Sequence, residues 1–305
     1  MKIIATTTWN SSDVIETFLQ HYRKLGFDQV LVMDFDSTDG TNEILRSDRY
    51  HGFVRTIPFP GFVERDSSRI FLEQAKNQFN PDTGCLFCDP DELLVLPDGM
   101  GISDLITAAA SAIILPRFNM TGRLSSIRSS DQQNFPLEIL NLRIQKPSRR
   151  KSLEDMRKDV LVPPWIYTAI PGKVFARLGP TLSIGDGDHT AVVSDNRVIP
   201  ACQGAYLMHF PFRSYKAFEE KMRLAASDFG SNPQLAETYG WQIRRWLRIA
   251  KSGTLYDEYL QQFVPDGQVD QLIEEGTLVL DNSVRALHTE LKEREQDRIS
   301  LRSSR

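Results

Sequence analysis

Three carboxylates fall within four residues, at Asp89, Asp91 and Glu92, directly after an apolar run. Carboxylates this close repel each other, and without a nearby cation one of them would hold its proton. Mg²⁺ or Mn²⁺ would remove the conflict, because carboxylate oxygens suit these ions, which bind through one or two carboxylates and substrate phosphates. Pro90 stiffens the turn. The stretch predicts a metal site with Asp89 and Asp91 as ligands, against the simpler interpretation of a solvated turn.

Two further stretches could complete such a centre. Asp186 and Asp188 stand beside His189 in a glycine-rich turn, where they could supply a general base or a metal ligand, or form a plain turn. Asp188 is the first choice for the base, Asp186 the alternate, and Glu92 a rival that could also brace the acidic turn. His209 ends an apolar run and is predicted as a metal ligand, with a half-buried, hydrogen-bonded histidine as the alternative.

Hydrophobic periodicity predicts the elements that position these residues. We expect strands over residues 2–7, 29–33, 53–57, 85–88 and 112–115, and helices over about 14–25, 42–46 and 68–79. This alternation predicts an α/β fold with a mostly parallel central sheet and helices on both faces. Ligands in such sheets bind beyond the carboxyl ends of the strands, so the acidic turns at 34–39 and 89–92 should converge.

The remainder of the chain is less regular. Residues 119–205 hold most of the glycine and proline clusters and a basic loop at 146–151, whereas residues 213–290 have helical patterns. We therefore expect a catalytic domain over residues 1–212, a C-terminal helical segment over 213–290, and a disordered, charged tail over 291–305.

Composition excludes several classes of protein. A net charge of −4 and a pI near 5.8 argue against a nucleic-acid partner. No apolar run reaches the roughly 18 residues that span a bilayer, and the N-terminus lacks a signal-peptide core, so a cytoplasmic location is expected. Cys85 and Cys88 form a CxxC, but residues three apart on a strand point to opposite faces, which argues against zinc or redox chemistry.

Two blocks resemble glycosyltransferase family 2, in particular its bacterial branch with a DxDE-type motif: TTWNSSDVIETFLQHYRKLGFDQVLVMDFDSTDGT (7–41) and LFCDPDELLVLPDG (86–99). Weaker matches are Gly172-Lys173-Val174, His189 in GDGDHT, and MHFPFRSYKAFEEKM (208–222). The resemblance covers about the first 225 residues. It implies a GT-A nucleotide-sugar-binding fold, a nucleotide-sugar donor (a UDP-sugar as the first expectation), a Mn²⁺ or Mg²⁺ cofactor, and sugar transfer with inversion to a glycan or other hydroxyl acceptor.

Carried over by position, the resemblance places Thr7, Thr8 and Asn10 near the nucleotide, and Asp34 at the turn that contacts base or ribose. Asp89 and Asp91 would hold the metal and the ribose diphosphate. Many members have a second acid where this chain has Phe35, so Asp36 or Asp39 would take over contact with the base. Candidate cations for the leaving diphosphate are Arg65, Arg69, Lys173 and the basic loop, although a solvated surface role is the ordinary one for each.

Other interpretations remain open. A nucleotidyltransferase could use the same kind of sheet, but TTTWNSSD lacks the glycine-rich basic loop expected of one, and a non-catalytic nucleotide- or glycan-binding domain is a third possibility. Gln242, Arg245 and Trp246 match a QxxRW motif of processive family members, with a chance match in an amphipathic helix favoured. Residues 213–251 carry eight Lys or Arg against four acids, which suggests either a helix docked on its own domain, the favoured interpretation, or peripheral contact with the inner face of a membrane.

Overall fold

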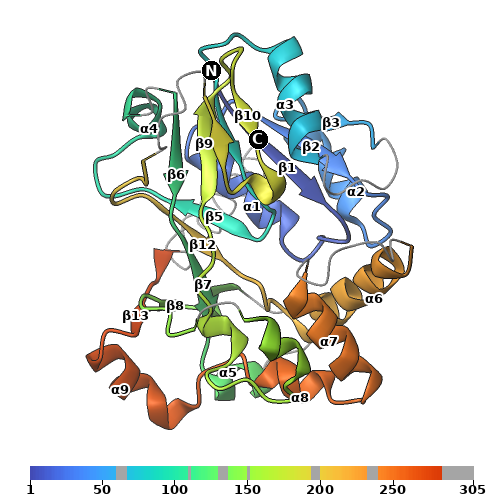
Figure 1. Cartoon of the computed structure of the whole chain (residues 1–305). Coiled ribbons are helices and arrows are strands. Elements are labelled where there is room, and N and C mark those ends of the chain that lie inside the picture. Colours follow the sequence, from blue (N-terminus) through green and yellow to red (C-terminus); the bar gives the residue numbers. More distant parts are fainter. Residues whose placement is uncertain are drawn as a thin grey trace, which may run out of the picture. The chain divides into compact units, whose positions relative to one another are not determined.

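The computed structural model describes residues 1–59, 67–108, 111–129, 137–149, 152–193, 200–231 and 240–283 (Figure 1). The chain divides into two compact units. The first comprises Met1–Phe118 and Ile170–His209, and the second comprises Asn119–Ala169 and Phe210–Arg305. The predicted tail at 291–305 lies outside the described residues.

The first unit is organised around a six-stranded sheet with the strand order β3-β2-β1-β4-β9-β6 (Figure 1). The strands are β1 (Lys2–Thr8), β2 (Gln29–Asp34), β3 (Val54–Ile57), β4 (Gly84–Phe87), β6 (Ala112–Leu115) and β9 (Lys173–Arg177). β3, β2, β1 and β4 are parallel, and β9 is antiparallel to both β4 and β6. Each of the five strands predicted for this sheet is present.

The prediction of a mostly parallel sheet was wrong, because the sheets are mixed. β9 lies in the segment that had no predicted strand, and it inserts between β4 and β6. Its apolar signal is only three residues long, Val174 to Ala176, and basic residues stand at both ends. A short strand of this kind is not distinguishable from a loop by periodicity alone.

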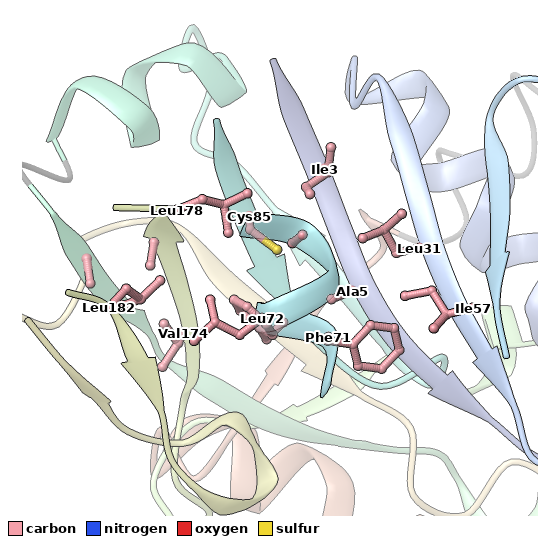
Figure 2. Packing of buried hydrophobic residues seen from close by; sticks show 14 of the residues in the cluster. Ile3, Ala5, Leu31, Ile57, Phe71, Leu72, Cys85, Val174, Leu178 and Leu182 are labelled. Atoms are coloured by element: carbon pink, nitrogen blue, oxygen red, sulfur yellow. The ribbon is translucent and has the colours of Figure 1, made fainter. Parts of the chain in front are cut away.

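The helices of the first unit are α1 (Ile15–Lys24), α2 (Thr41–Leu45), α3 (Ser67–Gln78) and α4 (Ile102–Ala108). α3 buries Phe71, Leu72 and Ala75 against side chains of one face of the sheet, among them Ile3 and Cys85 (Figure 2). Strand residues alternate between faces, so Ile4, Val30, Val32 and Leu86 point to the opposite face, where they are also fully buried. This two-sided burial explains why the strands have continuous apolar sequences.

A second strand pair carries the acidic motif. β5 (Glu92–Val95) pairs antiparallel with β12 (Tyr206–His209), and Glu92 lies opposite His209 in the register. α1 anchors β5, because the ring Nε2 of His21 is 2.7 Å from the carbonyl oxygen of Leu94 and the Tyr22 hydroxyl donates to the carbonyl of Glu92. The short strands β10 (Ser183–Ile184) and β11 (Ala191–Val192) bracket the glycine-rich turn.

The chain passes into the second unit within β7 (Arg117–Thr121). In this unit β8 (Leu142–Ile144) pairs antiparallel with β7 and with β13 (Leu278–Leu280). The helices are α5 (Leu124–Ser129), α6 (Tyr215–Ser231), α7 (Trp241–Lys251), α8 (Leu255–Leu260) and α9 (Val269–Glu274). The described residues after 213 thus form α6 to α9, and they also include the strand β13, which was not predicted.

Candidate functional site

Hydrogen bonds join two polar turns at the carboxyl ends of β1 and β2, residues 9–12 and residues 35–40, which we call the locked turns. The Asn10 backbone N–H donates to Ser37 Oγ at 2.8 Å, and Asn10 Oδ1 accepts from the Thr38 N–H at 2.8 Å. The Ser12 N–H donates to Asp39 Oδ2 at 2.9 Å. The parallel pairing of β1 and β2 brings these turns together, because parallel strands end at one edge of a sheet. The convergence of the turns at 34–39 and 89–92 stays a prediction.

Two of the predicted nucleotide-binding acids brace this turn pair. Asp34 accepts from the Ser37 N–H at 3.1 Å and from Asn42 Nδ2 at 2.6 Å. Asp39 accepts from the Thr41 N–H at 3.1 Å and the Thr41 hydroxyl at 2.6 Å. Burial raises the pKa of Asp39, but the hydrogen bonds from Thr41 and Ser12 outweigh it and leave the pKa lowered. Both carboxylates therefore hold the turn in shape, and the exposed Asp36 is left to face solvent.

Three non-glycine residues in the described part of the chain have a positive φ: Asn10 at 44°, Asp36 at 54° and Asp188 at 61°. This region is uncommon for residues with a side chain, and such strain concentrates at functional sites. All three were candidate residues from the sequence. The backbone thus marks the two polar turns and the glycine-rich turn.

The acidic turn between β4 and β5 is closed on itself. The Glu92 N–H donates to the Asp89 carbonyl at 3.0 Å, and the Asp89 N–H donates to Glu92 Oε2 at 2.9 Å. Glu92 is completely buried and forms an ion pair with Arg117. Burial and repulsion from Asp89 and Asp91 raise its pKa to about 7, against the opposing effect of Lys173 and Arg117. Glu92 therefore braces the turn, which was the alternative to a role as base.

Lys173 lies at the centre of the acidic residues. Its Nζ is 3.0 Å from Asp89 Oδ2 and 3.0 Å from the Gly187 carbonyl oxygen, and it lies 3.7 Å from Asp188 and 3.9 Å from Glu92. The side chain is only 2% exposed. Burial alone would lower the pKa of Lys173, but the three carboxylates raise it, so the ammonium stays charged. The cation predicted for a diphosphate is thus bound to the chain's own acids.

Asp188 differs from the other acids of the centre. Its Oδ1 is buried and accepts no hydrogen bond from the residues that the structure describes. Burial raises the pKa of this carboxyl, while Lys173 and a hydrogen bond from Ser68 act in the other direction. A buried acceptor without a donor is costly, and it is expected where a ligand supplies the missing partner. Asp188 therefore offers a buried acceptor oxygen for which the described residues supply no donor.

His189 contacts the backbone just before β9. Its Nδ1 is 2.8 Å from the Gly172 carbonyl oxygen. Burial and the positive charges of Arg117 and Lys173 lower the pKa of His189 to about 4. At neutral pH the ring is therefore neutral, and it fixes the glycine-rich turn to the start of β9.

His189 predicts a specific loss of stability in acid. The unfolded chain takes up a proton at the ordinary histidine pKa of about 6.5, whereas the folded chain does so only near 4, so stability is full above 6.5 and falls as the pH drops through this window. We expect His189→Asn to reduce the loss between pH 7 and 5 by about 1–2 kcal/mol. Urea unfolding of both proteins at the two pH values measures it, and identical slopes would contradict it.

The three predicted metal ligands do not form a metal site as they are placed. In the described residues, no group of three or more His, Cys, Asp or Glu side chains could hold a metal ion. Asp89 is paired with Lys173 and lies 3.9 Å from Arg117. Asp91 and His209 are both buried, at 8% exposure. The donor set does not fit a resident Mg²⁺ or Mn²⁺, because an ammonium already neutralises the acid that would ligate it.

The remaining predicted residues have varied positions. Thr7 and Thr8 end β1, and the buried Thr8 Oγ1 has no hydrogen-bond partner within the described structure. Arg69 is exposed on α3 and pairs with Glu73. The side chain of Asp186, Arg65 and the last two residues of the basic loop lie outside the described part of the chain.

The rest of the basic loop belongs to the second unit and has structural partners. Lys146 donates to the Glu275 carbonyl at 3.0 Å. Arg149 is buried and ion-paired with Asp155. Arg149 thus has a structural role, and Lys146 contacts the second unit through one hydrogen bond.

Sequence reasoning missed Arg117. This side chain is 8% exposed, pairs with Glu92, and donates through Nε to the Pro171 carbonyl at 3.1 Å. The available signal was weak: an arginine that follows a predicted strand and Pro116. The rejection of a CxxC site is supported, because Cys85 packs under α3 whereas Cys88 lies 3.6 Å from the Tyr22 hydroxyl, and burial raises the pKa of both thiols.

Two residues of the QxxRW match have structural partners in the described part of the second unit. Arg245 is 1% exposed and donates to both carboxylate oxygens of Glu258, at 2.6 and 2.9 Å, and Trp246 Nε1 donates to the same carboxylate. Trp246 also packs against Trp165 and Phe212. The apolar face of α7 is thus covered by its own unit, as the docked interpretation predicted. None of the described helices has the length and apolarity needed to cross a membrane.

Comparison with known proteins gives distant structural matches. Fragment 1–349 of S. aureus TarS in complex with UDP matches with a TM-score of 0.41 and 18% identity, over 90% of this chain and 78% of that chain. The same fragment in complex with UDP-GlcNAc gives 0.42 and 15%, over 90% and 92%. HddC from Yersinia pseudotuberculosis gives 0.26 and 6%, over 39% and 58%. At these values the likeness assigns neither a substrate nor residue roles to this chain.

Comparison by sequence adds no assignment. No protein-family model and no curated protein matches this chain.

Proposed function

We propose that this chain is an inverting glycosyltransferase that moves a sugar from a nucleotide-sugar donor, with UDP-sugars as the first candidates, to a hydroxyl acceptor. The observation that carries the proposal is Asp188, whose buried Oδ1 has no donor among the described residues and whose backbone is left-handed. The resemblance of residues 7–41 and 86–99 to family 2 supplies the reaction class.

The two locked turns are the proposed nucleotide site. Asn10 and Asp36 have strained backbones there, and Thr8 Oγ1, which has no hydrogen-bond partner among the described residues, lies at the end of the adjoining strand. Asp34 and Asp39 already accept hydrogen bonds from residues of the turns, so Asp36 is the acid of this turn that can contact the base or ribose. Phe35 packs against Phe59 at a centroid distance of 4.7 Å, so it supports the turn from the apolar side.

In the proposed reaction, Asp188 accepts the proton of the acceptor hydroxyl as that oxygen bonds to the anomeric carbon. The bond from this carbon to the diphosphate breaks on the opposite face, which inverts the configuration, and the nucleoside diphosphate leaves. The raised pKa of Asp188 brings a carboxylate closer to the operating pH of a general base. Lys173 bonds to the Gly187 carbonyl and forms an ion pair with Asp188, and these contacts hold Asp188 in position before the substrate binds.

A binding experiment tests the proposed nucleotide site. We expect one nucleoside diphosphate from a panel of UDP, GDP, CDP, ADP and dTDP to bind in calorimetry, and its sugar conjugate to release that diphosphate on incubation. Asp36→Asn should weaken binding by about 10- to 100-fold, since a hydrogen bond to a charged group contributes about 1.5–3 kcal/mol.

Asp48→Asn is the matched control, because Asp48 is also an exposed acid of the first unit but lies away from the locked turns. It should bind like the parent. A chain that binds no nucleoside diphosphate and turns over no nucleotide sugar would contradict the proposed function. Equal weakening by both variants would show that Asp36 has no specific contact.

A further inference from the structure

We infer that Lys173 is a built-in cation that takes the place of a divalent metal: it holds Asp89, Glu92 and Asp188 in one centre, which assembles without Mg²⁺ or Mn²⁺. Its relevance to catalysis rests on the proposed function, but its assembly does not. The acidic motif by itself predicts a metal ion. The structure has the ammonium of Lys173 among the carboxylates instead.

The surroundings of Nζ are those of an oxygen-coordinated cation. Oxygens of Asp89 and Gly187 lie at 3.0 Å, and those of Asp188 and Glu92 at 3.7 and 3.9 Å. An ammonium has three donors and no acceptor, so it can satisfy several oxygens at once as a compact point charge. The distances are those of hydrogen bonds and ion pairs, because an ammonium cannot approach oxygens at the 2.0–2.6 Å of a Mg²⁺ or Ca²⁺ ligand shell.

The fold dictates that a lysine side chain enters the centre. Lys173 opens β9 and lies opposite Leu115 of β6 in the register. The preceding residue, Gly172, has no room for a side chain, because a Cβ there would lie 2.3 Å from the Leu115 carbonyl oxygen. β9 can therefore approach β6 closely enough to fix the start of the strand. The Lys173 side chain is only 2% exposed, so its ammonium contacts the buried carboxylates and not solvent.

The charges explain why the lysine makes a metal unnecessary. Lys173 and Arg117 both contact Asp89 and Glu92, and Lys173 also contacts Asp188. Within this described cluster, Lys173 and Arg117 relieve part of the repulsion that would recruit a divalent ion, while Asp89 and Asp91 still raise the pKa of Glu92. Bringing in a metal of charge +2 would require the displacement of the ammonium from Asp89.

The test uses Mn²⁺ alone, titrated into the apo protein and followed by electron paramagnetic resonance. We expect no specific site in the parent protein. Lys173→Met removes the ammonium with similar volume, and we expect it to acquire one Mn²⁺ site at least about tenfold tighter than any binding in the parent, because unpaired carboxylates are ligands for this ion. Lys173→Met combined with Asp89→Asn should lose that site.

Lys76→Met is the matched control. Lys76 donates to the carbonyl oxygens of Pro180 and Leu182 in the same unit, and no carboxylate of the described residues pairs with it, so its removal should create no Mn²⁺ site. A parent protein that binds one Mn²⁺, with the site lost in Asp89→Asn, would overturn the inference. So would a folded Lys173→Met protein that acquires no site.

A measurement on the parent protein alone covers the case in which Lys173→Met does not fold. The affinity for the nucleoside diphosphate that binds should be the same in EDTA and in Mn²⁺, within about twofold, whereas a loss of tenfold or more in EDTA would overturn the inference. If no nucleotide binds, the proposed function fails, and the result with Mn²⁺ alone still decides whether Lys173 replaces a metal.

Discussion

Asp188→Asn should lower kcat by about 10²–10⁴-fold while the affinity for the donor stays within about twofold, because the amide keeps the shape of the carboxylate but cannot accept the proton. The structure favours this residue because its Oδ1 is buried with no partner among the described residues and lies on a strained backbone. Lys173, at 3.7 Å, is close enough to stabilise the ionised form.

Comparison with Glu92→Gln distinguishes a general base from a residue that stabilises the acidic turn. Glu92 closes the acidic turn and pairs with Arg117, so its replacement leaves a buried guanidinium without its charge partner and should lower stability together with activity. Asp188→Asn should leave the urea midpoint nearly unchanged. Turnover, donor Kd and stability are measured on the same preparations. If the Asp188→Asn protein keeps most of its turnover, Asp188 is not the general base.

Arg245→Met should destabilise the second unit by about 3–5 kcal/mol, the cost of removing one partner from a buried ion pair. The guanidinium is fully buried, bonds to both oxygens of Glu258, and also donates to the Lys158 and Asp159 carbonyls at 2.9 and 2.7 Å. Its loss leaves Glu258 charged and buried, with Trp246 and Gln262 as remaining donors.

Gln242→Ala tests the alternative reading of the same motif. Gln242 lies on α7 but is only partly buried, so its replacement should change stability by less than about 0.5 kcal/mol. If QxxRW contacted a growing product, both variants would alter acceptor use, and Gln242→Ala would do so without a change in stability. Chemical unfolding followed by tryptophan fluorescence, together with activity on the native fraction, gives both readouts.

The sequence by itself determined the parallel half of the sheet and the residues at its edge. The strands around Ile4, Val30 and Leu86 were recognisable because strands buried on both faces have continuous apolar sequences. The helix over residues 15–24 was recognisable from its periodicity. Parallel strands end at one edge, so the sequence also predicted polar turns at the carboxyl ends of these strands.

What each candidate residue does was decided by tertiary contacts, because a charged side chain acts according to its neighbours and these come from distant segments. Asp89 was predicted as a metal ligand, but it forms an ion pair with Lys173, 84 positions away. Lys173 belongs to β9, a strand too short to be recognised from the sequence. Glu92 became a brace because Arg117 pairs with it. Among the acids of the centre whose side chains are described, Asp188 alone kept a buried oxygen without a described donor, a property that depends on tertiary contacts and that the sequence could not show.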